Sequence, residues 1–281
     1  CFGVRDALAL LDTVESPRDV TIHGDLVHNP TVLVQLDVRG FQRAAEHDRQ
    51  AVPVTPAVMI TAHGVSDRER QRLLAAGKSL IDTTCPLVER AHQAAQKLRA
   101  EGRHVLVIGR RGHVEVRGIV EDLVSYDIVE QLADVQTYPY PKLGVMCQTT
   151  TPPREVERIR AEIITRNPHA SVRLIDTVCQ PTRDRQLALQ RLVERVDAVV
   201  VVGGRNSNNT RQLVELCREG GVPAHHVQSA ADVQAEWFTP DQAIGLTAGT
   251  STLDSTIDEV EEALRSLEVQ PYPMACNERQ S

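Results

Sequence analysis

The sequence predicts an α/β protein built from three similar units, each a small parallel sheet covered by helices. Two nearly identical stretches carry this prediction. LIDTTCP ends at Pro86 and LIDTVCQP ends at Pro181, and each is a short apolar strand that runs into a cysteine. Cys85 and Cys179 are 94 residues apart, and Cys1 precedes Cys85 by 84 residues. A period of about 90 residues indicates three copies of one structural unit.

The same pattern of elements follows each of the three cysteines. PLVERAHQAAQKLRAEG, after Cys85, has apolar residues at helical spacing and precedes the apolar strand HVLVIG. The third copy has QPTRDRQLALQRLVERV and then DAVVVVGG, and the first has FGVRDALALLDTVESPRD and then VTIHG. Such strand–helix–strand crossovers are typical of parallel sheets. We therefore expect units over 1–84, 85–178 and 179–281, packed as a pseudo-threefold trefoil around a central cavity.

The repeat also leads to an expectation about the start of the chain. Cys85 and Cys179 each follow an LIDT strand, whereas no residue precedes Cys1. We therefore expect that a strand of several residues belongs before Cys1 and is absent from this sequence. The alternative is an N-terminal nucleophile hydrolase that uses the thiol and free amine of Cys1. Those enzymes are built on antiparallel sheets, whereas this pattern predicts parallel ones.

Composition excludes several functional classes. The 281 residues are 41% hydrophobic and 25% charged, as in ordinary globular proteins. The net charge of −7 provides no basic surface of the kind that binds nucleic acid, and no apolar run approaches the roughly 20 residues that span a membrane. Six cysteines without a CxxC pair are too sparse for a disulfide scaffold. We expect a cytoplasmic protein with reduced thiols.

Three matched cysteines at one cavity suit a soft metal centre such as an iron–sulfur cluster. Three ligands on a four-iron cluster leave one iron open, which can act as a Lewis acid, whereas a closed structural site uses four ligands. Each matched cysteine begins a predicted helix, where backbone N–H groups stabilise a thiolate. Cys147, Cys217 and Cys276 lie outside the repeat, and we expect them to be small buried hydrophobic residues.

Polar segments follow the strands of each unit and suit an anionic ligand. GDLVHNP, TAHGVS, GRRGHVEV and GGRNSNNT place His28, His63, His113 and Ser207 at strand ends, beside the N–H groups of following helices. For each of these histidines, the alternative is a structural role without a ligand. No P-loop or GxGxxG motif occurs, so a nucleotide is not indicated. Glu115 lies two residues past His113, in a segment predicted to be a loop that faces the cavity. Its carboxyl could deliver a proton there, and the alternative is a solvated loop glutamate.

Taken together, these motifs resemble the 4-hydroxy-3-methylbut-2-enyl diphosphate reductases, the IspH/LytB family. The matching stretches are CFGV, LVHNP, AHGVS, DTTCPLV, GHVEV, QTT, DTVCQPTRDRQ, VVGGRNSNNT and LTAGTST, in the same order over essentially the whole chain. The resemblance implies a trefoil of three domains around a [4Fe–4S] cluster. It implies reductive removal of an allylic hydroxyl to give isopentenyl and dimethylallyl diphosphate. That reaction is the last step of the non-mevalonate isoprenoid pathway.

The resemblance further implies a role for each motif residue. Cluster ligands would be Cys1, Cys85 and Cys179, with one iron left open. Catalytic residues would be Thr149, which holds the substrate hydroxyl, and Glu115, which supplies its proton. The diphosphate would bind His28, His63, His113, Ser207, Asn208, Asn209 and Ser251. Single electrons would come from a ferredoxin or a flavodoxin.

Two other functions remain open at this level. Quinolinate synthase-like proteins also combine a pseudo-threefold fold with three cysteines and an open iron, but they catalyse condensation and dehydration without net reduction. A non-catalytic homologue would sense redox state or bind ligand without turning the diphosphate over. Substrate-dependent oxidation of a reduced viologen separates the reductase from both.

Overall fold

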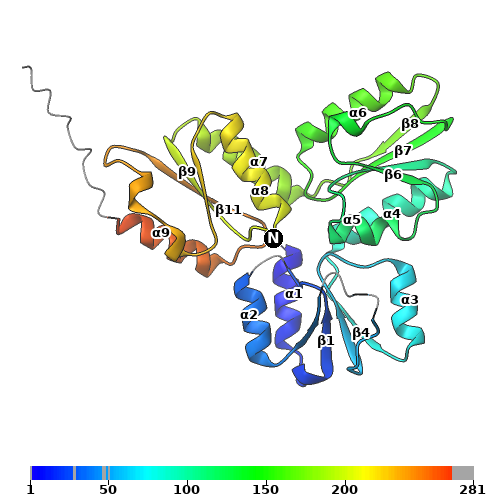
Figure 1. The fold of residues 1–281 in the computed structure, drawn as a ribbon, viewed down its shortest axis with the longest axis horizontal. Coiled ribbons are helices and arrows are strands. Elements are labelled where there is room, and N and C mark those ends of the chain that lie inside the picture. The colour runs from blue at the N-terminus through cyan, green and yellow to red at the C-terminus, as the bar shows by residue number, and fades with distance from the viewer. Residues whose placement is uncertain (1, 28–29, 46–48, 50, 268–281) are drawn as a thin grey trace, which may run out of the picture. The chain divides into compact units, whose positions relative to one another are not determined.

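The structure is a computed structural model of the chain (Figure 1). It describes residues 2–27, 30–45, 49 and 51–267. The chain divides into two compact units, Cys1–Arg185 and Gln186–Ser281. Over the described ranges there are three small sheets, two in the first unit and one in the second, and all their strand pairs are parallel. The predicted α/β class with three small parallel sheets is thus confirmed.

The first sheet has the strand order β2-β1-β3-β4. Its strands are β1 (Val20–His23), β2 (Gln42–Ala44), β3 (Ala57–Ile60) and β4 (Ser79–Asp82). The accompanying helices are α1 (Phe2–Asp12), the short η1 (Pro17–Asp19), α2 (Pro30–Arg39) and α3 (Asp67–Ala75). β1 and β3 form the interior pair, with Val20 opposite Ala57, and nearly all their side chains are buried. Near-continuous burial is what interior strands of a parallel sheet require.

The second sheet has the order β6-β5-β7-β8. Its strands are β5 (His104–Ile108), β6 (Tyr126–Val129), β7 (Lys142–Cys147) and β8 (Ser171–Ile175). The helices are α4 (Pro86–Ala100), α5 (Val114–Val120), the short η2 (Leu132–Asp134) and α6 (Pro153–Arg166). Alternate residues of β5 face opposite ways: Val105 and Val107 pack with α4 and α5, whereas Leu106 and Ile108 pack with α6. Helices therefore cover both faces of this sheet (Figure 1).

Helix α4 shows how the sequence sets one of these elements. Pro86 occupies the first helical position, directly after Cys85, where its missing N–H costs no hydrogen bond. Val88, Ala91, Ala95 and Leu98 are buried at the three- and four-residue spacing of one helix face. This pattern fixes which face of α4 packs on the sheet and leaves the opposite face for charged residues.

The sheet of the second unit has the order β10-β9-β11. Its strands are β9 (Ala198–Val202), β10 (Ala224–Val227) and β11 (Ile244–Ala248). The helices are α7 (Gln180–Val193), which runs from the first unit into the second, α8 (Asn208–Glu219), η3 (Ala230–Asp232), η4 (Ala235–Trp237) and α9 (Asp254–Arg265). All five residues of β9 are buried, so this central strand forms the core between the two helical layers.

The predicted order of elements after each matched cysteine is confirmed. Helices α1, α4 and α7 are followed by the buried strands β1, β5 and β9. Cys147 and Cys217 are fully buried, as expected. Cys1, His28 and Cys276 lie outside the described residues. The trefoil arrangement and the predicted limits of the three units stay predictions.

One local prediction was wrong. Glu115 was predicted to lie in a loop, but it stands in the first turn of α5 and is only 2% exposed. The helix has seven residues, which is too short for a clear helical period in the sequence. In addition, none of the described helices combines the length and the hydropathy that a membrane crossing requires.

Candidate active site

Sulfur and polar side chains of the first unit gather where its parallel strands end. Cys85 follows β4, Thr149 follows β7 and Cys179 follows β8. His63 and His113 follow β3 and β5 in the same way. Because ligands bind beyond the carboxyl ends of parallel strands, this edge of each sheet is the expected place for a site.

Cys85 is tied to the neighbouring strand end and to the start of the chain. Its backbone N–H donates to the carbonyl oxygen of Ala62 at 3.0 Å, one residue before His63. A Cβ atom added to Gly3 would lie 2.4 Å from Cys85 Sγ. Only a glycine at this position lets the first turn of α1 approach the thiol so closely. The segment that follows Cys1 in the sequence is therefore in contact with Cys85.

Cys179 is held against Thr149. The Cys179 N–H donates to the Thr149 carbonyl oxygen at 2.9 Å, and Cys179 Sγ lies 3.1 Å from the hydroxyl of Thr182. Burial raises the pKa of the Cys179 thiol, and the negative charges of Glu115 and Cys85 raise it further. The two thiols and the carboxyl of Glu115 are therefore close enough to interact electrostatically.

Glu115 forms the chemical centre of this group. Its carboxyl is buried and accepts two hydrogen bonds from Thr149. The backbone N–H of Thr149 donates to Oε1 at 2.7 Å, and the Thr149 hydroxyl donates to Oε2 at 2.9 Å. Burial raises the pKa of Glu115 to about 7, although both hydrogen bonds oppose this shift. A carboxyl with this pKa can hold or release a proton near neutral pH.

Two histidines lie at the start of α5, beside the backbone of Glu115. His113 is the N-cap of α5, and its Nδ1 accepts from the Glu115 N–H at 3.2 Å. In the neutral ring this acceptor role leaves the proton on Nε2. The ring of His63 lies 5.8 Å from that of His113, with the ring planes at 83°. The two imidazoles thus contact each other, and His113 contacts the backbone of Glu115, within the first unit.

The second unit carries its own polar cluster at the start of α8. Ser207 is the N-cap, and its hydroxyl accepts from the Thr210 N–H at 3.3 Å. It occupies the same place after β9 that His113 occupies after β5, as the repeat predicts. Asn208, next along the helix, is also buried, at 8% exposure. The backbone N–H groups of such a helix start favour an anion.

Asn209 joins α8 to the segment after β11. Its Oδ1 accepts from the Thr250 N–H at 3.0 Å, next to the buried Ser251. Asn209 is 1% exposed, and its Nδ2 has no hydrogen-bond partner within the described part of the chain. A buried donor without a partner costs free energy unless a ligand or water accepts from it. This cluster therefore suits an oxygen-rich ligand.

Glycines let the polar segments of the second unit approach each other closely. A Cβ atom on Gly203 would lie 2.4 Å from Thr210 Oγ1, and one on Gly249 would lie 2.1 Å from the same atom. Thr210 itself is completely buried. The GG and TAGT motifs thus hold the ends of β9 and β11 against the first turn of α8.

Sequence reasoning missed Thr182 and Gly3. Thr182 is fully buried and contacts the Cys179 sulfur, three residues after it on α7. The i, i+3 spacing on a predicted helix was the available signal for this contact. No sequence pattern links Gly3 to Cys85, because that contact joins segments 82 residues apart.

The fold and the clusters define an α/β enzyme with a buried thiol and carboxyl site and a polar cluster suited to an anion. Comparison of the chain with known proteins agrees with this class of enzyme. A family model described as LytB protein matches residues 1–265. A relative from Anaeromyxobacter sp. (strain Fw109-5), named 4-hydroxy-3-methylbut-2-enyl diphosphate reductase, is 34% identical over 276 residues, which is 95% of this chain and 94% of that protein.

Two solved structures share the fold. The E-1-hydroxy-2-methyl-but-2-enyl-4-diphosphate reductase from Plasmodium falciparum is 27% identical, with a TM-score of 0.85 over 95% of this chain and 84% of that one. An (E)-4-hydroxy-3-methyl-but-2-enyl diphosphate reductase, described as the terminal enzyme of the non-mevalonate pathway, is 30% identical, with a TM-score of 0.66 over 95% and 96%. The chain belongs to the LytB protein family.

Proposed function

We propose that this chain is a 4-hydroxy-3-methylbut-2-enyl diphosphate reductase. It removes the allylic hydroxyl of its substrate and yields isopentenyl and dimethylallyl diphosphate. The observation that carries the proposal is the buried Glu115 carboxyl, hydrogen-bonded to Thr149, whose own carbonyl accepts from Cys179. This arrangement puts a proton donor with a pKa of about 7 beside thiols suited to an iron–sulfur centre.

The residues present fit a [4Fe–4S] cluster. Cys85 and Cys179 are soft, buried donors, and the charge of Cys85 raises the pKa of Cys179. A positively charged iron centre bound to both sulfurs would remove this repulsion. In the part of the chain that the structure describes, no group of three His, Cys, Asp or Glu residues is arranged to hold a metal ion. We assign the third ligand to Cys1, on its motif and on the contact of Gly3 with Cys85.

When bound, such a cluster would supply a Lewis-acidic iron and a route for single electrons. The protein supplies the proton. In the carboxylate form of Glu115 the Thr149 hydroxyl donates to Oε2; in the protonated form the carboxyl donates instead. The Thr149 hydroxyl, which then accepts from Glu115, can donate its own proton in a hydrogen bond to the substrate hydroxyl. Protonation lets that hydroxyl leave as water, which is a far better leaving group than hydroxide.

The polar clusters anchor the diphosphate. We assign this role to His63 and His113 of the first unit and to Ser207, Asn208, Asn209 and Ser251 of the second, with His28 added on its motif. The unpartnered Nδ2 of Asn209 is a ready donor to a phosphate oxygen. Binding energy gained at the diphosphate orients the allylic end of the substrate.

The overall reaction consumes two electrons and two protons per substrate. The C–O bond breaks, a C–H bond forms at either of two carbons, and water leaves. We propose a ferredoxin or a flavodoxin as the source of the electrons, delivered one at a time. A cytoplasmic location stays a prediction.

The test is substrate-dependent oxidation of reduced methyl viologen by the anaerobically reconstituted protein. We expect wild-type protein to oxidise two viologens per substrate. We expect Glu115→Gln to lower turnover at least about a hundredfold with iron and sulfide content unchanged. Near-normal turnover of this variant would reject the role of Glu115. No substrate-dependent oxidation by loaded wild-type protein would reject the reductase in favour of a quinolinate synthase-like dehydratase or a non-catalytic homologue.

A further inference from the structure

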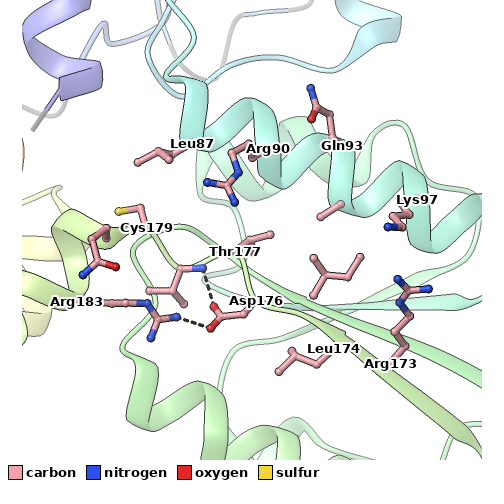
Figure 2. A pocket seen from close by; sticks show the side chains of 14 residues that line it. Leu87, Arg90, Gln93, Lys97, Arg173, Leu174, Asp176, Thr177, Cys179 and Arg183 are labelled. Carbon is pink, nitrogen blue, oxygen red and sulfur yellow. Dashed lines mark hydrogen bonds and ion pairs between the residues drawn. The ribbon is translucent and has the colours of Figure 1, made fainter.

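A groove of about 750 Å³ lies on the first unit, with Cys179 among its lining residues (Figure 2). One wall is a face of α4 and the other is β8, the edge strand of the second sheet, with the start of α7. Cys179 and Leu87 lie at one end of the groove, and Lys97 and Arg173 lie toward the other (Figure 2). Leu87 is two residues past Cys85, so both walls begin beside the proposed cluster ligands.

The groove is strongly basic. Its charged lining residues are Arg90, Lys97, Arg173, Arg183 and a single acid, Asp176. Asp176 pairs with Arg183, which leaves three further cations on this surface. The whole chain carries a net charge of −7, so this local excess of positive charge is opposite in sign to the protein.

Two of these cations have no ion-pair partner among the residues that the structure describes. Arg173 pairs with Glu101, but neither Arg90 nor Lys97 forms an ion pair with any described residue. Both are exposed, and they stand seven residues apart, about two turns along the same face of α4. Unpaired cations at this spacing offer two separate points of contact to a negatively charged surface.

The exposure of these cations favours a protein over a small anion. A site for a small anion uses charged or polar groups withdrawn from water, whereas Arg90, Lys97 and Arg173 are all exposed. A broad set of exposed charges is typical of surfaces that steer a protein partner. Apolar residues such as Leu87 and Leu174 lie between the charges, as in the centre of a protein interface.

We propose that this groove is the docking site of an acidic one-electron carrier protein. The proposal rests on the proposed function, because a reductase without a nucleotide-binding motif needs an external electron donor. Two reduced carriers dock in succession, and each leaves oxidised by one electron. The two electrons, with two protons, break the C–O bond of the substrate, form the new C–H bond and release water. Cys179 at the end of the groove brings the docked carrier next to the reaction site.

Charge reversal tests the site. We expect the cluster-loaded Arg90→Glu/Lys97→Glu variant to bind an oxidised acidic ferredoxin about tenfold more weakly than wild type in calorimetric titrations at low salt. The difference should shrink as salt rises from 50 to 300 mM, because added salt shortens the screening length, which is about 10 Å at 0.1 M and about 8 Å at 0.15 M. Turnover driven by ferredoxin should fall with binding. Turnover driven by methyl viologen, which needs no docking surface, should stay at the wild-type rate.

Arg158→Glu/Arg160→Glu is the matched control. These residues lie on α6, which covers the opposite face of the second sheet, and their reversal changes the net charge by the same amount. Equal ferredoxin affinity of wild type and the groove variant would overturn the proposal, and so would equal weakening by both variants. Failure of wild-type protein to turn over with viologen would instead reject the proposed function, while the titrations would still report on docking.

Discussion

The raised pKa of Glu115 predicts a pH-dependent cost to the stability of the cluster-free protein. The carboxyl has an ordinary pKa of 4.5, and burial raises it to about 7 in the folded chain. Between these values the folded state binds more protons than the unfolded state, so the free energy of unfolding falls as pH rises. The contribution is fully present below pH 4.5 and is lost by about pH 8.

The size of this cost follows from the shift. Each pKa unit corresponds to about 1.4 kcal/mol, so ionising Glu115 in the folded protein costs about 3 kcal/mol. Glu115→Gln removes the charge and keeps an oxygen that can accept from the Thr149 N–H. Relative to wild type, the variant should therefore gain about 2 to 3 kcal/mol in unfolding free energy between pH 5 and pH 8.

Urea unfolding of the cluster-free proteins at pH 5, 6, 7 and 8 measures this gain. Glu157→Gln is the matched control, because it removes an exposed carboxylate from α6 and should shift stability by less than about 0.5 kcal/mol at every pH. If wild type and Glu115→Gln lose stability in parallel as pH rises, the folded protein does not penalise the ionised carboxyl. The assignment of Glu115 as a proton donor would then lose its physical basis.

Three further substitutions test the surrounding geometry. Thr149→Val removes the hydroxyl that donates to Glu115 and should lower viologen-driven turnover at least tenfold, with iron content unchanged; normal turnover would exclude a relay through Thr149. Gly3→Ala puts a methyl group 2.4 Å from Cys85 Sγ, which forces the thiol to shift, and should reduce the iron bound per chain, whereas full iron content would show that this contact is dispensable. Asp122→Ala removes the carboxylate that accepts from two N–H groups at the start of α3, and should cost about 1 kcal/mol in urea unfolding; an unchanged midpoint would contradict a capping role.

The repeat made most of the fold predictable. Strands β4 and β8 overlap the matched LIDT segments that lead to Cys85 and Cys179, and the next strands along the chain, β5 and β9, are largely apolar runs. Strand β2 (Gln42–Ala44) was not predicted, because its three residues are largely exposed and carry no apolar pattern. It joins the sheet as an edge strand, where backbone pairing suffices.

The candidate site was predictable in its residue types and less so in its environment. Motif position identified Glu115 and Thr149, but burial of the carboxyl depends on α5, a seven-residue helix with a glycine at Gly118. A Cβ atom on Gly118 would lie 3.4 Å from Val65 and from His92, so this glycine allows close packing that no periodicity reveals. Burial of the carboxyl raises the pKa of Glu115, and this burial can be seen only in the structure.

The central claim is that Cys85 and Cys179 hold a single iron–sulfur centre. Its most direct test is iron and sulfide analysis, with Mössbauer spectra, of anaerobically reconstituted Cys85→Ser and Cys179→Ser, with Cys217→Ala as a buried control outside the repeat. The account predicts that either serine variant loses most of the cluster while Cys217→Ala keeps it. Equal iron, sulfide and spectra in all three variants and wild type would contradict it.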